Sequence, residues 1–551
     1  MYPVLRSTEL YKNHIKKEKQ QVFSTDDLSK KKNAFATVVC DPQLMEATIV
    51  SIYSLNAAFA KNPSSKSDIV VLVPESIQTN KEAIYKLDML GARVIRTSFP
   101  LEKECQLMMH LWALFDYEKV IYFSPDVMFK DNVDQLTDIP VHAAIITNEN
   151  DIPLFVLEPS SGSYESLVRG ATKLSNNNYN GTINKRFMEL IKEDYIQKRI
   201  PARLIDNVAQ IFSGPVKPWN FHAYKDTDWK KYYRPSEFYK WRSASNNARK
   251  FLEPRTDWVN QDRQSMICDS YLSTSNTSHF PVKNQFSVML STYNPERIEH
   301  ISLIIRHLLK SEKVHTVFVT WHNPALDIPP SLYDKIEESD YHRVKVLRQS
   351  FDSLNNRFNP EKELVTEAVY IMDDDIFTDL VDLENSFDIW ITRKDSIVGH
   401  FPRIHNYDPM TEKATYKVTR KAPYSIILTK SMFIRSEYLF AYTCLLEPKL
   451  HADVDRQLNC EDLGFAMMAS GMSGVGSTFV RTQRAMEDFG LKKGISTNSA
   501  HMPARAVCIS DFITNYWNKR DPLIKSYDTT TAFSRPQVKT GNWDRISKMI
   551  G

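Results

Sequence analysis

Hydrophobic residues along this chain gather in short blocks, and each block is followed by a stretch with helical periodicity. The alternation occurs twice. In the first half, the apolar blocks lie at 34–40, 69–73, 94–95 and 119–123. In the second half, they lie at 286–292, 314–319, 344–347 and 369–372. Strands that alternate with helices predict right-handed βαβ units and a mostly parallel sheet, so the pattern favours an α/β protein with two related domains.

Polar stretches suggest where these domains begin and end. Residues 1–33 are polar and rich in lysine, which is typical of a solvated arm or stem. A run of Ser, Thr and Asn within 273–284 is typical of a linker. We therefore expect a first domain over 34–272, closed by a stretch rich in Trp and Tyr, and a second domain over 285–551.

Composition narrows the classes of partner. The 551 residues include 70 Lys and Arg against 67 Asp and Glu, a formal net charge of +3. Such a balanced charge indicates no global attraction to nucleic acid or to an anionic membrane. No apolar run approaches 18 residues and no signal-peptide pattern is present, so we expect a soluble chain whose membrane tether, if the protein has one, lies outside this sequence.

The most informative stretch is the acidic triplet Asp373, Asp374 and Asp375. It follows an apolar, β-branched run that predicts a buried strand, and ligands of open α/β sheets bind at the carboxyl ends of the strands. Three adjacent carboxylates repel one another unless a divalent cation such as Mg²⁺ or Mn²⁺ compensates them. Taken alone, the triplet also fits a solvated acidic turn.

Other candidate residues lie near predicted strand ends and helix starts. Ser291 and Asn323 follow predicted strands, and Arg357 could neutralise a phosphate and reach the carboxylates. Asp462 precedes an apolar helical run, so it could be a carboxylate held at a helix N-terminus for chemistry, or simply a capping residue. A lone arginine such as Arg505 fits a surface ion pair equally well.

From about residue 286 to 527 the chain resembles the exostosin-type retaining glycosyltransferases, family 64. Eight motifs in the same order carry this resemblance, and together they are far more specific than any one of them. They are Ser291-Thr-Tyr-Asn294, Trp321-His-Asn323, Ser353-Leu-Asn-Asn-Arg-Phe358, Asp373-Asp-Asp375, Ile397-Val-Gly-His-Phe-Pro-Arg403, Tyr424-Ser425, Asn459-Cys-Glu-Asp462 and His501-Met-Pro-Ala-Arg-Ala-Val-Cys508.

The resemblance implies Mn²⁺ and a UDP-sugar donor, with UDP-GlcNAc favoured. By position it implies that Asp375 ligates the metal while Asp373 and Asp374 contact the ribose and the sugar of the donor. It implies donor contacts for Ser291, Asn323 and Arg357 as well. Two residues of the chain depart from the family pattern in a way that alters the uridine or phosphate contacts: Pro295 stands where an Arg is common, and His322 where an Asn is common.

The resemblance also implies the catalytic residues. Asp462 would face the donor sugar, and Arg505 would assist departure of the diphosphate. Retention of configuration needs either attack by Asp462 to give a covalent glycosyl-enzyme, or attack on the same face within an ion pair that Asp462 steadies. Both routes stay open.

Cys460 and Cys508 occupy positions that are disulfide-bonded in the family, and the alternative is a pair of buried free thiols. A bridge would link the Asp462 helix to the Arg505 segment. Sequons at Asn180 and Asn276, if used, and a bridge both require an oxidising compartment. We therefore expect the secretory pathway, in the Golgi or ER lumen.

Residues 34 to about 225 resemble the glycogenin-type family 8 glycosyltransferases more faintly. The motifs are Phe35-Ala-Thr37, Tyr117-Glu-Lys-Val-Ile-Tyr-Phe-Ser-Pro-Asp126, Val156-Leu-Glu-Pro-Ser160 and Gly214-Pro-Val-Lys-Pro-Trp219. Gly214 and Lys217, which would contact a diphosphate, are present. The metal-binding Asp-x-Asp is reduced to Asp126, and Ile211 replaces the metal-binding His. We expect this domain to be silent or metal-independent, and to serve as a stabilising or acceptor-binding partner.

The sequence thus predicts two GT-A-like α/β domains in tandem. The second would transfer a sugar with retention to an oligosaccharide, glycoprotein or glycolipid acceptor. The favoured sugar is an α-linked GlcNAc. Two alternatives stay open: transfer of mannose or another hexose to a glycolipid, and a non-catalytic glycan-binding subunit.

Overall fold

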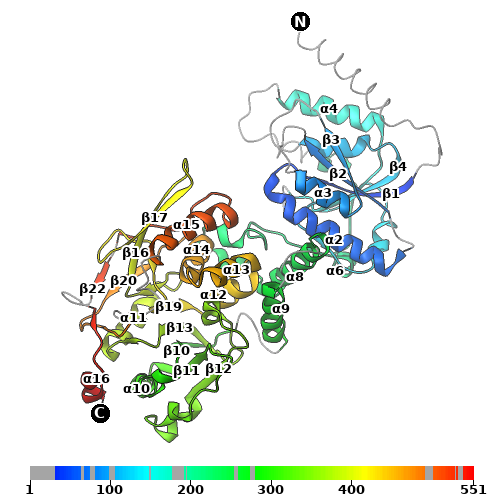
Figure 1. Cartoon of the computed structure of the whole chain (residues 1–551). Helices are drawn as coiled ribbons and strands as arrows, with labels where there is room; N and C mark the ends of the chain where they lie inside the picture. Colours follow the sequence, from blue (N-terminus) through cyan, green and yellow to red (C-terminus); the bar gives the residue numbers. More distant parts are fainter. Residues whose placement is uncertain are drawn as a thin grey trace. The chain divides into compact units, whose positions relative to one another are not determined.

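The computed structural model describes residues 31–63, 67–74, 81–97, 106–147, 151–175, 191–193, 195–253, 259–273, 279–490, 501–527, 529–531 and 538–550. The chain forms two compact units, Met1–Ile211 and Phe212–Gly551 (Figure 1). The sequons at Asn180 and Asn276 lie outside the described residues, as does most of the predicted arm. No helix within the described part of the chain is long and apolar enough to cross a membrane.

The first unit is built on a seven-stranded sheet with the order β3-β2-β1-β4-β7-β6-β8. Its strands are β1 (Lys31–Val38), β2 (Asp68–Pro74), β3 (Ala92–Thr97), β4 (Tyr117–Phe123), β6 (Ala143–Ile145), β7 (Leu154–Leu157) and β8 (Lys198–Arg199). The four predicted strands β1 to β4 are present and pair in parallel, whereas β7 runs antiparallel to β4. The helices of this unit are α2 (Met45–Lys61), α3 (Lys81–Met89), α4 (Ser161–Ser175) and α6 (Ala202–Val208).

The second unit contains an eight-stranded sheet with the order β12-β11-β10-β13-β19-β15-β20-β22. The predicted parallel strands are β10 (Val282–Thr292), β11 (Val314–Trp321), β12 (Val344–Arg348) and β13 (Thr366–Asp373). The other strands are β15 (Val398–Gly399), β19 (Ser431–Arg435), β20 (Thr478–Arg481) and β22 (Thr529–Thr531). The strand β19 runs antiparallel to β13. The prediction of mixed α/β units with Rossmann-like sheets is therefore confirmed.

Alternate residues of the central strands explain how this sheet is buried. Val288, Leu290, Tyr370 and Met372 point to one face, where they form a core with α10 (Ile298–Leu309), α11 (Leu380–Thr392) and α16 (Trp543–Ile550). The intervening side chains of β13 are buried as well, as expected for a parallel strand covered on both faces. This burial fixes the strand register and, with it, the position of the acidic triplet at the end of β13.

The remaining elements lie around the carboxyl edge of the sheet. A hairpin of β16 (Pro402–Asp408) and β17 (Lys413–Val418) pairs through β16 with β18 (Ile426–Ile427). The helix α15 (His501–Tyr516) packs along β17, as the red helix beside the yellow hairpin in Figure 1. The helices α12 (Glu437–Phe440), α13 (Pro448–Gln457) and α14 (Glu461–Ser473) fill the space between hairpin and sheet, and a π-helical turn, Ala441–Leu445, follows α12.

The boundary between the units differs from the predicted one. The helices α8 (Pro235–Leu252) and α9 (Val259–Leu272) were assigned to the first domain, but the units divide at Ile211. A disulfide joins Cys268 on α9 to Cys444 in the π-helical turn. Gln264 Nε2 donates to the carbonyl oxygens of Thr443 at 3.0 Å and Leu446 at 2.9 Å. These helices belong to the second unit because they satisfy backbone groups that an irregular helix leaves open.

The helix α16 covers a second part of the carboxyl edge. The ring of Trp543 stacks on His300 of α10, with centroids 3.8 Å apart, and on Phe489, with centroids 3.9 Å apart. Phe489 follows β21 (Glu487–Asp488), and Arg545 of α16 donates to Glu487 Oε2 at 2.7 Å. These contacts fix β21 beside the end of β13.

Candidate active site

The acidic triplet lies at the carboxyl end of β13, between β10 and β19. The register places Ser291 of β10 opposite Asp373 and Ser431 of β19 opposite Met372. The hydroxyl oxygen of Ser291 is buried and has no hydrogen-bond partner in the described ranges. The structure therefore brings Ser291 and the triplet to one edge, where a ligand could use this hydroxyl group.

Asp374 is held by the loop that follows β10. Thr292 Oγ1 donates to its Oδ2 at 2.7 Å, and Arg297 forms an ion pair with its Oδ1. Burial raises the pKa of Asp374, although Arg297 counteracts the rise. Neither Thr292 nor Arg297 was assigned a partner from the sequence, although Thr292 lies within the motif Ser291-Thr-Tyr-Asn294.

Asp375 is the carboxylate of the triplet that the protein leaves open. Its Oδ1 is buried and has no hydrogen-bond partner among the residues that the structure describes. Burial and repulsion from Asp373 raise its pKa to about 7. A Cβ atom added at Gly490 would collide with Asp375 Oδ2, so a larger residue here would displace the Asp375 carboxylate. A buried, unpartnered carboxylate oxygen among other anions fits a divalent cation.

The donor set also suits such an ion. Within the part of the chain that the structure describes, no group of three or more His, Cys, Asp or Glu could enclose a metal. Mg²⁺ and similar hard cations are commonly held by one or two carboxylates together with substrate phosphates. Asp375 fits the role of that single protein ligand.

Arg357 connects the triplet to the helix α14. It lies in the short helix η9 (Leu354–Phe358), and its guanidinium donates to Asp373 Oδ1 at 3.0 Å and to Thr429 Oγ1 at 2.7 Å. Its NH1 also lies 3.6 Å from Glu461 Oε1. The arginine therefore reaches the carboxylates, as the sequence predicted, and it spans two acidic groups from separate elements.

Asp462 and Arg505 form a buried ion pair near the start of α14. Asp462 Oδ2 pairs with Arg505, and its Oδ1 accepts from Leu463 N–H at 2.9 Å. Arg505 also donates to Asn459 Oδ1 at 3.1 Å. Burial disfavours its charged form, but Asp462 outweighs burial and raises the pKa of Arg505. The two candidate catalytic residues thus lie in direct contact.

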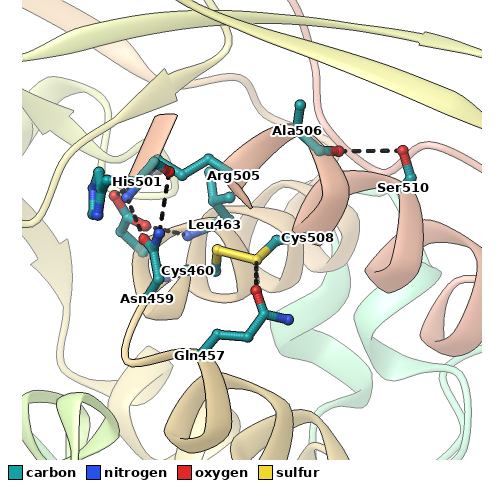
Figure 2. Close-up of a disulfide and its surroundings, with 10 residues drawn as sticks. Gln457, Asn459, Cys460, Leu463, His501, Arg505, Ala506, Cys508 and Ser510 are labelled. Atoms are coloured by element: carbon teal, nitrogen blue, oxygen red, sulfur yellow. Dashed lines mark hydrogen bonds and ion pairs between the residues drawn. A yellow bond between two sulfur atoms is a disulfide. The ribbon is translucent and has the colours of Figure 1, made fainter. Parts of the chain in front are cut away.

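A disulfide holds this pair of elements together. Cys460 precedes α14 and is bonded to Cys508 of α15, as the family resemblance implied. Figure 2 shows the bridge beside Arg505, which points toward Asn459. The free-thiol alternative is excluded for this pair, and the bridge links the two helices that carry Asp462 and Arg505.

Glu461 has a raised pKa, which its interpretation as a helix-capping residue did not predict. Burial and repulsion from Asp462 raise its pKa to about 7, while Arg357 counteracts part of the rise. Its side chain is 9% exposed. A carboxyl group of this kind can hold a proton near neutral pH beside Asp462.

His322 and Asn323 lie in the loop after β11. His322 Nδ1 contacts the Ser353 carbonyl oxygen at 3.1 Å, while its Nε2 is buried and finds no partner among the described side chains and backbone groups. Burial and Arg357 lower the pKa of His322 to about 4, so the imidazole is neutral at pH 7. Asn323 Oδ1 accepts from Ala325 N–H at 3.0 Å. A donor contact by Asn323 stays a prediction.

A cavity of about 740 Å³ opens beside these groups. Lys430 and Asp488, which neighbour Asp375, and Arg505, which pairs with Asp462, all contribute to its wall. Its floor includes the apolar side chains of Phe401 and Phe479. The cationic residues of the lining are Arg403, Arg420, Lys430, Arg481 and Arg505, against the single carboxylate of Asp488.

The residues predicted to be vestigial are divided between the units. Asp126 lies in the first unit, directly before Val127, which pairs with Ile211 across the strands β5 (Val127–Phe129) and β9 (Ala209–Ile211). Gly214, with φ of +96°, and Lys217 belong to the second unit. The Nζ of Lys217 donates to the Phe212 carbonyl oxygen at 2.5 Å. Ile211 is thus paired with Val127, the residue that follows Asp126.

Comparison with known proteins gives a consistent result for the second unit. A model of the Glycosyl transferase family 64 domain matches residues 286–533. A relative named Glycosyltransferase family protein 64 C3, from Arabidopsis thaliana, is 30% identical over 42% of this chain and 75% of its own length. Glycosylinositol phosphorylceramide mannosyl transferase 1, from the same plant, is 26% identical over 42% of this chain and 72% of its own length.

Two further similarities cover different shares of the matched proteins. Glucosamine inositolphosphorylceramide transferase 1 from Oryza sativa subsp. indica is 29% identical over 43% of this chain and 32% of its own length. Among solved structures, the apo-form glycosyltransferase GlyE of Streptococcus pneumoniae TIGR4 has 12% identity and a TM-score of 0.29, over 59% of this chain and 81% of that one. The matched motifs, their shared sheet edge and the plant relative together show that this chain belongs to glycosyltransferase family 64.

Proposed function

We propose that the second unit transfers a sugar with retention from a UDP-sugar to a glycan or glycolipid acceptor, using Mn²⁺. One observation carries the proposal. Lys430, Asp488 and Arg505 line one cavity; the charges of Lys430 and Asp488 act on Asp375, and Arg505 is paired with Asp462. A donor diphosphate and an acceptor can therefore meet at one edge of the sheet.

The donor would lie across the ends of β10, β11 and β13. Asp375 would hold the metal, which when bound offsets the charge of the departing diphosphate. Arg357 would contact the phosphates while its pairing with Asp373 fixes its direction. Ser291 and Asn323 would contact the nucleotide, and Asp373 and Asp374 the ribose and the sugar.

Asp462 would act at the anomeric carbon. The ion pair with Arg505 and the bond from Leu463 N–H hold its carboxylate in one orientation. From there it can attack the sugar, or steady the oxocarbenium ion while the acceptor enters on the same face. Arg505 would neutralise charge on the departing diphosphate. Glu461, which can hold a proton near pH 7, is a second acidic group beside Asp462.

The transferred sugar is proposed to be GlcNAc, and mannose or another hexose is the alternative. The relatives from Arabidopsis thaliana and Oryza sativa include both a mannosyl transferase and a glucosamine transferase of inositol phosphorylceramides. The cationic lining of the cavity favours an acceptor that carries a negative charge.

The first unit is proposed to be silent, and the whole protein to work in the secretory pathway. A lone Asp126 facing a strand with Ile211 offers a metal too few ligands. The disulfides Cys268–Cys444 and Cys460–Cys508 suit an oxidising lumen such as that of the Golgi or ER.

A donor screen tests this proposal. The full chain is mixed with Mn²⁺ and a series of UDP- and GDP-sugars, and thermal stabilisation and sugar release are measured. We expect one UDP-sugar to stabilise the wild type, Asp375→Asn to abolish the Mn²⁺-dependent part, and Asp126→Ala to behave as wild type. Loss of transfer in Asp126→Ala would assign the chemistry to the first unit. Absence of any donor response would favour a non-catalytic glycan-binding subunit.

A further inference from the structure

Lys430 occupies a position that donor binding and catalysis do not explain. It immediately precedes β19, and its carbonyl oxygen accepts from Asp373 N–H at 3.3 Å. Its Nζ donates to Asp488 Oδ2 at 3.0 Å, and the Asp488 side chain is only 2% exposed. The ammonium also lies 5.8 Å from the ring centroid of Phe401. The protein therefore holds a cation at the edge where a metal is expected.

The charges at this edge leave Asp375 in an unusual position. Each of the other carboxylates here has a close protein cation, in the pairs Arg357–Asp373, Arg297–Asp374 and Lys430–Asp488. Arg297 lies 3.7 Å from Asp375, and within the described part of the chain one oxygen of the Asp375 carboxylate has no hydrogen-bond partner. An incoming cation would therefore be drawn to Asp375.

The negative charge of Asp375 also attracts the ammonium group of Lys430. Burial disfavours its ammonium form, but Asp375 and Asp488 outweigh burial and raise the pKa of Lys430. Lys430 is therefore charged at neutral pH, when the site is ready to bind a ligand. Its field acts on the same carboxylate as the expected metal.

We propose that Lys430 is a built-in counter-cation for Asp375 and Asp488 that opposes binding of the free divalent ion. The inference rests on the proposed function, in which Asp375 holds that ion. A positive charge close to a cation site weakens binding of a second cation by repulsion. A nucleoside diphosphate brings compensating negative charge, so the site admits the ion together with the donor in preference to the ion alone.

The test measures Mn²⁺ binding to the full chain without nucleotide, by electron paramagnetic resonance of the free ion. Lys430→Gln removes the charge but keeps an amide that can donate to Asp488, and Lys430→Arg keeps the charge. We expect Lys430→Gln to bind Mn²⁺ roughly tenfold tighter than wild type, the size of effect that one nearby charge has on an ionisation. Lys430→Arg should bind as wild type. Lys313→Gln is the matched control, because Lys313 pairs with Asp388 before β11 at the opposite end of the strands.

The outcomes separate the two proposals. Equal Mn²⁺ affinity in wild type and Lys430→Gln, with Asp375→Asn abolishing binding, overturns the role of Lys430 and leaves the metal site standing. Unchanged Mn²⁺ binding in Asp375→Asn overturns the metal assignment itself. Repeating the titration with UDP present should bring wild type and Lys430→Gln closer together. A persistent tenfold gap would contradict the preference for the joint complex. Thermal unfolding of each variant confirms that it is folded.

Discussion

At the scale of single residues, two adjacent carboxyl groups at the start of α14 meet opposite surroundings. Asp462 is paired with Arg505 and accepts from Leu463 N–H. Glu461 Oε1 lies 3.6 Å from the Arg357 guanidinium. Burial together with repulsion from Asp462 raises the pKa of Glu461 to about 7. One step along the helix thus separates a fully paired carboxylate from one that takes up a proton near neutral pH.

This difference predicts a pH dependence of stability. The folded pKa of Glu461, about 7, exceeds its ordinary value of 4.5, so its contribution is fully present below about pH 4.5 and is lost as pH rises through 7. Glu461→Gln should therefore flatten the fall in unfolding free energy between pH 5 and pH 8, by on the order of 2 kcal/mol. Guanidinium unfolding at a series of pH values measures it, with exposed Glu337→Gln as the control. Parallel pH profiles for wild type and Glu461→Gln would contradict the assignment.

The sequence predicts some of these residues and misses others for a physical reason. Asp375 and Arg357 could be found because a strand ending in carboxylates and an arginine in a nearby motif are local patterns. Lys430 and Asp488 could not, since Lys430 immediately precedes β19 and Asp488 lies in β21, and the pairing partners of these strands are chosen only in the folded sheet. Glu461 was visible as an acidic residue at a helix start, but its pKa depends on burial.

At the scale of elements, the π-helical turn Ala441–Leu445 connects α9 to the short helix η9, which carries Arg357. Gln264 of α9 satisfies the Thr443 and Leu446 carbonyl oxygens from one side. On the other side, Thr443 Oγ1 donates to the Phe358 carbonyl oxygen at 2.9 Å, directly after Arg357. Such turns are often found at functional sites. The helix α9 therefore supports the element that carries Arg357.

Removing the side-chain amide of Gln264 should expose this link. Gln264→Leu leaves two buried carbonyl oxygens without donors, which should cost about 2–3 kcal/mol of unfolding free energy. The substitution should also weaken UDP binding several-fold, because the short helix η9, which carries Arg357, loses support. Gln285→Leu is the matched control, since Gln285 donates to the Glu312 carbonyl oxygen at an exposed site. Denaturant unfolding and UDP titration check both effects, and equal results for the two variants would show that α9 is only a neighbour.

At the scale of the whole molecule, the periodic blocks predict both sheets but not the boundary between the units. Parallel strands can be recognised in a sequence as apolar runs, and all of the predicted parallel strands are present. The sequence of α8 and α9 is amphipathic and rich in aromatic residues, and such a pattern does not reveal which domain the two helices pack against. The disulfide Cys268–Cys444 and the Gln264 contacts assign both helices to the second unit.

This assignment predicts how the chain can be shortened. A chain that starts at Phe212 should unfold cooperatively and bind UDP like the full protein. A chain that starts at Phe286, where the family match begins, loses Cys268 and uncovers the π-helical turn. Its melting temperature should fall by about 10 °C or more, since a disulfide closing so long a loop is itself worth several kcal/mol. Differential scanning calorimetry compares the two. Equal melting temperatures would place α8 and α9 outside the folding unit.

The stack of Trp543 between His300 and Phe489 has a consequence for the order of folding. The strand β21, which carries Asp488, gains its cover only when α16 has been synthesised. Because domains form progressively during synthesis and distant contacts are made late, the central strands can pair while this corner is still bare. A nascent chain can therefore pass through a stage in which the central strands are paired while the corner at β21 is still uncovered.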